Sequence, residues 1–173
     1  MNRAELLARL QDTTLQLLAH ASAPEKELDR SYAPGKWTAR QVLAHLADVE
    51  VVNLWRFLMA VSEPGSEAGA FDENRWAEQL QYERRPGAVS GEVIRGARTL
   101  LLHLVETLPE ATLQNSNLHP EKGVMSGFDW AALIDDHARH HLGQIDAARR
   151  GTTWTPPPPG PTTWKYTGQP RPR

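Results

Sequence analysis

Two histidines four positions apart are the residues of this sequence best suited to binding a metal ion. His137 and His141 lie in the segment DDHARHHL. On a helix, residues four apart occupy the same face, so both imidazoles can reach one ion. Such a pair taken alone is more often part of a solvated helix face. Ala138 stands where the zinc-protease signature H-E-x-x-H requires Glu, which disfavours a thermolysin-like protease.

A third histidine on another predicted helix changes this interpretation. His45 lies in the otherwise apolar stretch VLAHLA. Alone it would be interpreted as a hydrogen-bonded core residue, but facing helices of a bundle commonly build metal sites from their inward side chains. Three neutral imidazoles leave a fourth coordination position for water or substrate, as in catalytic zinc sites. We therefore predict that one divalent metal ion is bound by His45, His137 and His141.

Four long helices must position these histidines. Apolar residues recur at helical spacing and predict helices at about 3–20, 39–61, 90–107 and 127–150. Capping boxes at Thr38-x-x-Gln41 and Ser126-x-x-Asp129 mark the starts of the two helices that carry the histidines, and Ser90 is the expected N-cap of the third. A short helix is expected around 73–80, and turn-forming residues predict a small hairpin within 109–126.

The predicted fold class is all-α, with one four-helix bundle over residues 1–151 and a proline-rich tail over 152–173. Residues 156–159 are four consecutive prolines, and further prolines follow, which excludes regular helix. The tail is expected to be extended, and either to pack along the bundle or to stay mobile.

Composition excludes several classes of function. The 173 residues are 40% hydrophobic and carry a formal net charge of −2, with no broad basic face for nucleic acid. No run approaches the roughly eighteen apolar residues needed to span a membrane, so a cytoplasmic protein is expected. Cysteine is absent, which rules out disulfides, cysteine-ligated zinc and a cysteine nucleophile. Any thiol chemistry must therefore use a thiol from outside the protein.

The other histidines and two tryptophans receive simpler interpretations. His140 is rotated about 100° from His141 on a helix and is expected to point elsewhere. His119 lies in the predicted hairpin turn and is expected to be solvated. Trp37 precedes the third histidine and Trp55 follows it, and both are expected to pack within the bundle.

Two segments resemble motifs of the DinB/YfiT-like metalloproteins. GKWTARQVLAHLAD, which contains His45, is similar to the first motif of that superfamily, and HARHHLGQI, which begins at His137, is similar to the last. Between them, Asn53, Arg56-Phe57, the segment DExxWAE from Asp72 and the segment HPE from His119 resemble the YfiT branch. The resemblance spans residues 32–145.

The resemblance implies a four-helix bundle in which the three histidines bind one divalent metal, commonly zinc or nickel. It also implies a homodimer. In the YfiT branch it implies a metal-dependent transferase that joins a small thiol, bacillithiol, to electrophilic small molecules. Many relatives are described only as metal-dependent hydrolases.

Four further residues are candidates for contacts at the site. Asp48, Asn53 and Arg56 follow His45 at i+3, i+8 and i+11, near the same helix face. They are expected either to orient a ligand histidine or to hold a polar, carboxylate-bearing thiol; an ordinary polar helix edge is the equal alternative for Asp48 and Arg56. Gln144, three residues after His141, is a similar candidate.

Three functions remain open from the sequence. A thiol in the fourth coordination position would be deprotonated by the ion and would attack an electrophile. Alternatively, a metal-bound hydroxide would hydrolyse a small substrate. In a third alternative, the bundle is not catalytic and the metal only stabilises the fold or a dimer. The small thiol and the electrophile are the expected partners, with neither nucleic acid nor membrane.

Overall fold

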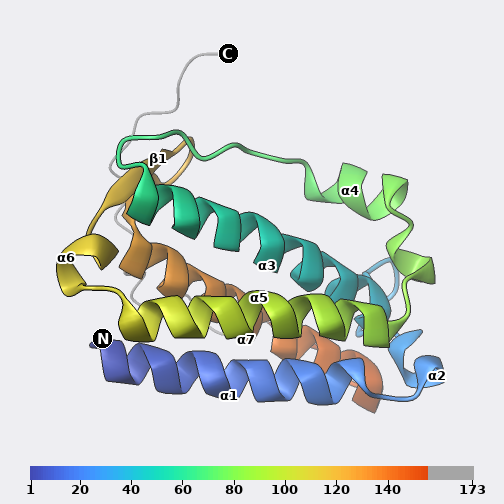
Figure 1. The fold of residues 1–173 in the computed structure, drawn as a ribbon. Helices are drawn as coiled ribbons and strands as arrows, with labels where there is room; N and C mark the ends of the chain where they lie inside the picture. The colour runs from blue at the N-terminus through green and yellow to red at the C-terminus, as the bar shows by residue number, and fades with distance from the viewer. Residues whose placement is uncertain (156–173) are drawn as a thin grey trace.

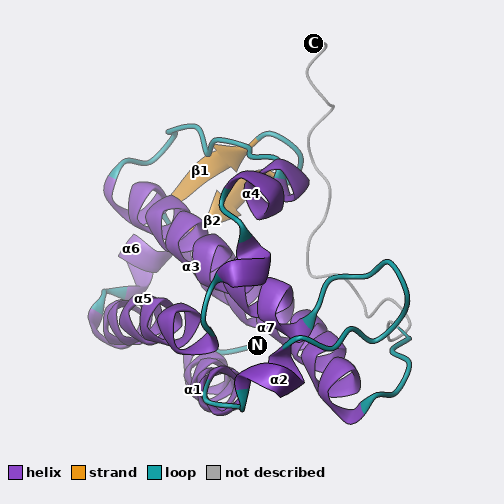
Figure 2. Cartoon of the chain, turned by 90° about the vertical axis from the view of Figure 1, so that its right-hand side faces the viewer, coloured by secondary structure: helices purple, strands orange, loops and turns teal. Residues whose placement is uncertain are grey.

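The computed structural model describes residues 1–155, and four long helices make up most of them (Figure 1). They are α1 (Arg3–Ala21), α3 (Ala39–Ser62), α5 (Gly87–Thr107) and α7 (Gly127–Arg150). Helices α1 and α3 each pack against both α5 and α7, so α1 and α3 lie diagonally across the bundle (Figure 2). This confirms the predicted all-α class and the four-helix bundle.

Short elements close the ends of the bundle. They are α2 (Glu25–Leu28), α4 (Glu73–Gln79), the 3-10 helix η1 (Tyr82–Arg84) and α6 (Glu110–Leu113). Strands β1 (Ser116–His119) and β2 (Gly123–Ser126) form the predicted hairpin, which is antiparallel with Ser116 opposite Ser126. Within residues 1–155, no helix is both long and apolar enough to cross a membrane.

The two helices that carry the histidines begin at the predicted capping boxes. The Thr38 hydroxyl accepts a hydrogen bond from the Gln41 amide, and the Gln41 side chain accepts one from the Thr38 amide. Ser126 and Asp129 make the same reciprocal pair at the start of α7. Each box satisfies two free N–H groups, and so fixes where the helix starts and which face it turns inward.

The start of α5 differs from the prediction. The helix begins at Gly87 rather than after Ser90, and Ser90 is fully buried in its first turn instead of serving as the N-cap. Gly87 allows this earlier start because a Cβ there would lie 2.5 Å from Leu28 and 2.8 Å from the carbonyl oxygen of Ala21. The absence of a side chain lets α5 begin in direct contact with α1 and α2.

A buried polar layer separates two large apolar clusters in the bundle. Each long helix contributes one residue to it: Thr13, Glu50, Arg98 and Asp135. Arg98 donates to both carboxylate oxygens of Glu50, at 2.6 and 2.8 Å, and to the Thr13 hydroxyl at 3.3 Å. Thr13 in turn donates to Asp135 at 2.9 Å. The layer therefore joins all four helices two residues before His137.

The first residues after the bundle pack against α7. The Trp154 ring lies 5.6 Å from that of Tyr32 and 4.9 Å from that of His140. It covers Gly143, where a Cβ would lie 2.5 Å from the Trp154 Nε1. The remainder of the predicted proline-rich tail, 156–173, lies outside the described residues.

Candidate metal centre

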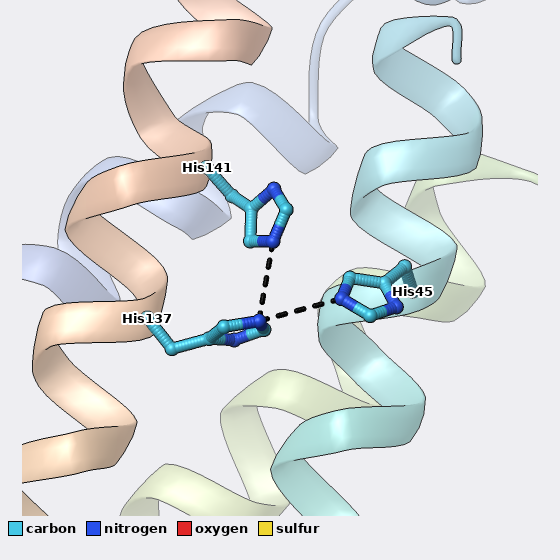
Figure 3. Close-up of side chains that lie close together, drawn as sticks. All are labelled: His45, His137 and His141. Carbon is cyan, nitrogen blue, oxygen red and sulfur yellow. Dashed lines mark hydrogen bonds between the residues drawn. The ribbon is translucent and has the colours of Figure 1, made fainter. Parts of the chain in front are cut away.

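The structure brings His45, His137 and His141 together between α3 and α7 (Figure 3). The Nε2 atoms of His45 and His137 are 3.4 Å apart, and those of His137 and His141 are 3.1 Å apart. One ring nitrogen from each residue lies within 4.8 Å of the others. In the described part of the chain, these three residues form a group that could hold a metal ion. The three side chains point at one another from two helices that are far apart in sequence.

The donor set fits a divalent metal ion. A tetrahedral ion with metal–nitrogen bonds of about 2.0–2.1 Å holds its ligand nitrogens about 3.3 Å apart, close to the separations observed here. Burial lowers the pKa of His45 to about 4 and that of His141 to about 3, and it also lowers the pKa of His137 well below its usual value. At neutral pH the three imidazoles are therefore uncharged and keep the lone pairs that a metal ion requires.

Two of the rings are oriented by different means. His141 Nδ1 lies 2.7 Å from Gln144 Oε1. Because an amide oxygen only accepts, Nδ1 carries the proton and the lone pair of Nε2 faces the other histidines. His45 is held instead by packing against Trp37, with ring centroids 5.2 Å apart, and its Nδ1 is buried with no hydrogen-bond partner in residues 1–155.

Asp48 is hydrogen-bonded to Arg85 rather than to a histidine of the site. Its two carboxylate oxygens accept from Arg85 at 2.6 and 3.1 Å, and Arg85 also donates to the Ala44 carbonyl oxygen and lies over the Tyr82 ring. This arrangement attaches η1 to α3. Asp48 makes no hydrogen bond to His45 and acts on it only through its charge, which favours the protonated imidazole. The structure thus shows Asp48 bonded to Arg85, and its predicted role at the site stays a prediction.

An open cleft of about 410 Å³ leads to two of the histidines, His45 and His137. Asn53 and Arg56 line it, and Arg56 donates to Asn53 Oδ1 at 3.0 Å. Lys122 from the hairpin turn lines it as well. The volume lies within the range of small-molecule sites, so the cleft can admit a compact ligand to the histidines.

Glu73 is a cleft residue that the sequence interpretation did not select. Its Oε2 lies 4.0 Å from His45 Nε2, and its side chain is more than half exposed. Asp72 caps α4 by accepting from the amides of Asn74 and Arg75, and so places Glu73 at the first helical position. The pattern DExxWAE signalled the helix, but only the path of the preceding loop brings this carboxylate to His45.

His119 and Trp55 lie where they were not expected. His119 is buried rather than solvated, because the hairpin folds its ring onto Trp130 at 5.6 Å and its Nδ1 accepts from the amides of Glu121 and Lys122. Trp55 is 47% exposed and lies on the outer face of α3 rather than in the core. His140 is exposed and turned toward Trp154, as its angular offset from His141 indicated.

Comparison with known proteins identifies the family. The DinB superfamily matches residues 3–145. A protein of Oceanobacillus iheyensis named "Putative metal-dependent hydrolase" is 30% identical over 154 residues, which cover 89% of this chain and 86% of that protein. A protein of Bacillus mycoides with the same name is 31% identical over 130 residues, 75% of each chain.

A solved structure shares the fold. It is YfiT from Bacillus subtilis, described as "a probable metal-dependent hydrolase with an unusual four-helix bundle topology". It superposes with a TM-score of 0.77 at 24% identity, and the match covers 86% of both chains. This agrees with the four-helix bundle that the motifs implied. The chain belongs to the DinB superfamily.

Proposed function

We propose that this chain is a metal-dependent enzyme that acts on small molecules, with one divalent ion held by His45, His137 and His141. The observation that carries the proposal is the convergence of three neutral imidazole nitrogens beside an open cleft that reaches two of the three histidines. The fitting ions include zinc and nickel, since both accept imidazole ligands. A site closed by protein on all sides would indicate a structural ion instead.

The residues of the chain divide the work of such a site. A bound divalent ion supplies Lewis acidity, which lowers the pKa of a nucleophile beside it. Gln144 fixes the direction of the His141 lone pair. Glu73, 4.0 Å from His45 Nε2 and open to solvent, is placed to accept the proton that the nucleophile loses.

For the finer activity, we propose transfer of a low-molecular-weight thiol such as bacillithiol to an electrophile. The thiol loses its proton, its sulfur bonds to the electrophilic carbon, and the leaving group departs with the electron pair of the broken bond. The chain has no cysteine, so the sulfur nucleophile comes from outside. Motifs similar to the YfiT branch support this choice over other nucleophiles.

Hydrolysis is the second candidate. The relatives from Oceanobacillus iheyensis and Bacillus mycoides carry the name of metal-dependent hydrolases, and Glu73 is equally well placed to take a proton from water. Here the water oxygen bonds to the acyl carbon and the leaving group departs with a proton. A bundle with a purely structural ion is the least supported alternative, because charged residues line a cleft that reaches the histidines.

The test begins with the metal. Zinc-loaded wild-type protein is compared with His137→Ala, His141→Ala and, as the matched control, His103→Ala, which removes an exposed histidine of α5. The two ligand variants should lose the stoichiometric ion, whereas the control should keep it. A full equivalent of metal in both ligand variants would refute the site.

Activity is then measured with a panel of small thiols and a chloronitroaromatic dye, and separately with ester and amide substrates without thiol. Thiol-dependent conjugation that disappears in His141→Ala supports the transferase. Ester or amide turnover without conjugation replaces it with the hydrolase. Inactivity in every assay, with the metal bound, refutes both. The homodimer and the cytoplasmic location expected from the sequence belong to this same proposal.

A further inference from the structure

Arg56 is a buried cation with no carboxylate bonded to it. Its residue is only 5% exposed. One terminal nitrogen donates to Asn53 Oδ1 and the other to the carbonyl oxygen of Gly69, while Nε is buried without a hydrogen-bond partner. In residues 1–155 no carboxylate oxygen lies within ion-pair distance of its guanidinium. A buried charge without a bonded carboxylate is costly, so its presence needs an explanation.

The other two buried arginines show how this chain normally treats such a charge. Arg98 binds both oxygens of Glu50, and Arg40 binds Glu25 and Asp29. The half-buried Arg85 likewise binds Asp48. Each of these guanidiniums holds helices together through a carboxylate of the chain itself. Arg56 differs from them because it borders the open cleft.

Aromatic rings hold the Arg56 guanidinium in place. Its carbon lies 5.7 Å from the centroid of Phe71 and 5.4 Å from that of Trp130. Trp130 is itself fixed, since its Nε1 donates to Asn117 at 2.7 Å. The guanidinium is therefore prepared in one position before any ligand arrives, which reduces the entropy lost on binding.

Charge near Arg56 favours an anion at this end of the cleft. Lys122 and the buried His119 line the same cleft, and Arg56 and Lys122 both lower the pKa of His119 after the effect of its burial. Glu121 lines it too, but that residue is exposed and lies at ion-pair distance from none of the described cations. Burial lowers the pKa of Arg56, and the charge of Glu121 opposes this effect. Because Glu121 is exposed, solvent screens its charge, so Arg56 and Lys122 still leave this end of the cleft positively charged.

The spacing sets the size of the ligand. Arg56 follows His45 by eleven residues on α3, or about 16 Å along the helix axis. Both side chains lean toward the N-terminus of the helix, so only the greater length of the arginine shortens this separation. A ligand that touches both must therefore be an elongated small molecule that lies along the cleft of about 410 Å³.

We propose that Arg56, Asn53 and Lys122 form a carboxylate-binding subsite, and that the enzyme takes small organic acids whose reacting group lies at the histidines while the carboxylate lies on Arg56. The reaction in this statement rests on the proposed function. The binding of the carboxylate does not, because Arg56 lies in the cleft independently of any metal. The two parts can therefore fail separately.

The first experiment measures carboxylate binding to metal-free protein. Glutarate is titrated into the wild type, Arg56→Met, Arg56→Lys and the control Arg84→Met, whose side chain is 77% exposed, and binding is followed by calorimetry and by amide chemical shifts. Charge-assisted hydrogen bonds of about 1.5–3 kcal/mol predict affinity about 10- to 100-fold weaker in Arg56→Met. Arg56→Lys, which keeps the charge but loses the paired donors, should be intermediate. The Arg84→Met control should equal the wild type.

Two results would overturn the subsite. One is no saturable glutarate binding to the wild type; the other is equal affinity in the wild type and Arg56→Met. Thermal unfolding of Arg56→Met separates binding from folding, because removal of an uncompensated buried charge should leave the melting temperature unchanged or higher. A markedly lower melting temperature would show that the arginine is structural and would also refute the proposal.

The second experiment uses the zinc-loaded enzyme. N-acetylcysteine is compared with its methyl ester as the thiol in the conjugation assay. The ester should raise KM about tenfold or more in the wild type and change little in Arg56→Met. Conjugation with no preference for the free acid refutes the subsite alone. Glutarate binding without any conjugation refutes the proposed transferase and leaves the subsite standing.

Discussion

Gln144→Ala should weaken metal binding without weakening the fold. Within residues 1–155, the Gln144 side chain makes one hydrogen bond, to His141 Nδ1 at 2.7 Å, and it is half-buried. Removing the partner that orients a ligand histidine typically costs 10- to 100-fold in metal affinity. Because the partner here is a neutral amide and water can reach the vacated place, a net hydrogen-bond energy of about 0.5–1.5 kcal/mol applies. This energy corresponds to a loss of about 2- to 13-fold in affinity, so a loss of up to about tenfold is expected.

The assay is competition for zinc between the protein and a chelator of known affinity, at one fixed pH. Gln144→Glu provides the opposite change, since a carboxylate accepts the Nδ1 proton more strongly, and it should bind zinc at least as tightly as the wild type. Gln11→Ala on the exposed face of α1 is the matched control. Alanine is a better helix former than glutamine, so neither alanine variant should lose stability.

If Gln144→Ala binds zinc with an affinity within about twofold of the wild type in this assay, the assigned orientation of the His141 ring is contradicted. Equally weakened zinc binding in Gln144→Ala and Gln144→Glu would also contradict it. Such a result would show that the shape of the side chain, and not its acceptor oxygen, affects metal binding.

Three further predictions concern stability. Arg98→Met leaves Glu50 buried without its partner and should lower the unfolding free energy by about 3–5 kcal/mol in urea titrations; a loss below about 1 kcal/mol would contradict the described ion pair. Gly127→Ala places a Cβ 2.5 Å from Val61, and this overpacking should lower the unfolding free energy by about 1–3 kcal/mol in the same titrations. Gly96→Ala is the control, because no atom lies within 4 Å of a Cβ at that position. His119, with its pKa lowered to about 4 from 6.5 by burial, binds protons more readily when unfolded, so its contribution to stability is lost as pH falls from about 6.5 to 4. His119→Gln should therefore lose less unfolding free energy than the wild type between pH 7 and pH 5, and an equal loss would contradict the buried, neutral ring.

Local sequence signals predicted much of the fold. The Thr38 and Ser126 capping boxes, each with its partner three residues later, gave the starts of α3 and α7 to the residue. The chemistry of a cap is contained within four consecutive residues, so no distant contact is needed to recognise it. The start of α5 was missed because it depends on the contact of Gly87 with Leu28, a residue of α2 that is 59 positions away in the sequence.

Long-range partners decided what sequence could not. Glu50 and Arg98 resemble ordinary polar positions of two helices, and only the packing of α3 against α5 shows that they are buried together. Asp48 was predicted from the sequence as a candidate beside His45, and only the structure shows that Arg85 is bonded to it. In contrast, the grouping of the three histidines could be predicted, because the i, i+4 pair and an inward-facing histidine on a second helix have few other ways to be arranged in a bundle.

The metal centre also has a topological consequence. His45 and His137 are 92 positions apart in the sequence, so an ion shared between them would close a chain loop that contains α4, α5, α6 and the hairpin. The unfolded chain could offer the ion only the neighbouring pair on α7, so mass action would favour the folded state. At a free-ion concentration 100 times the dissociation constant, that linkage contributes about 2.7 kcal/mol. The concentration of free metal would then help to set the fraction of the bundle that is folded.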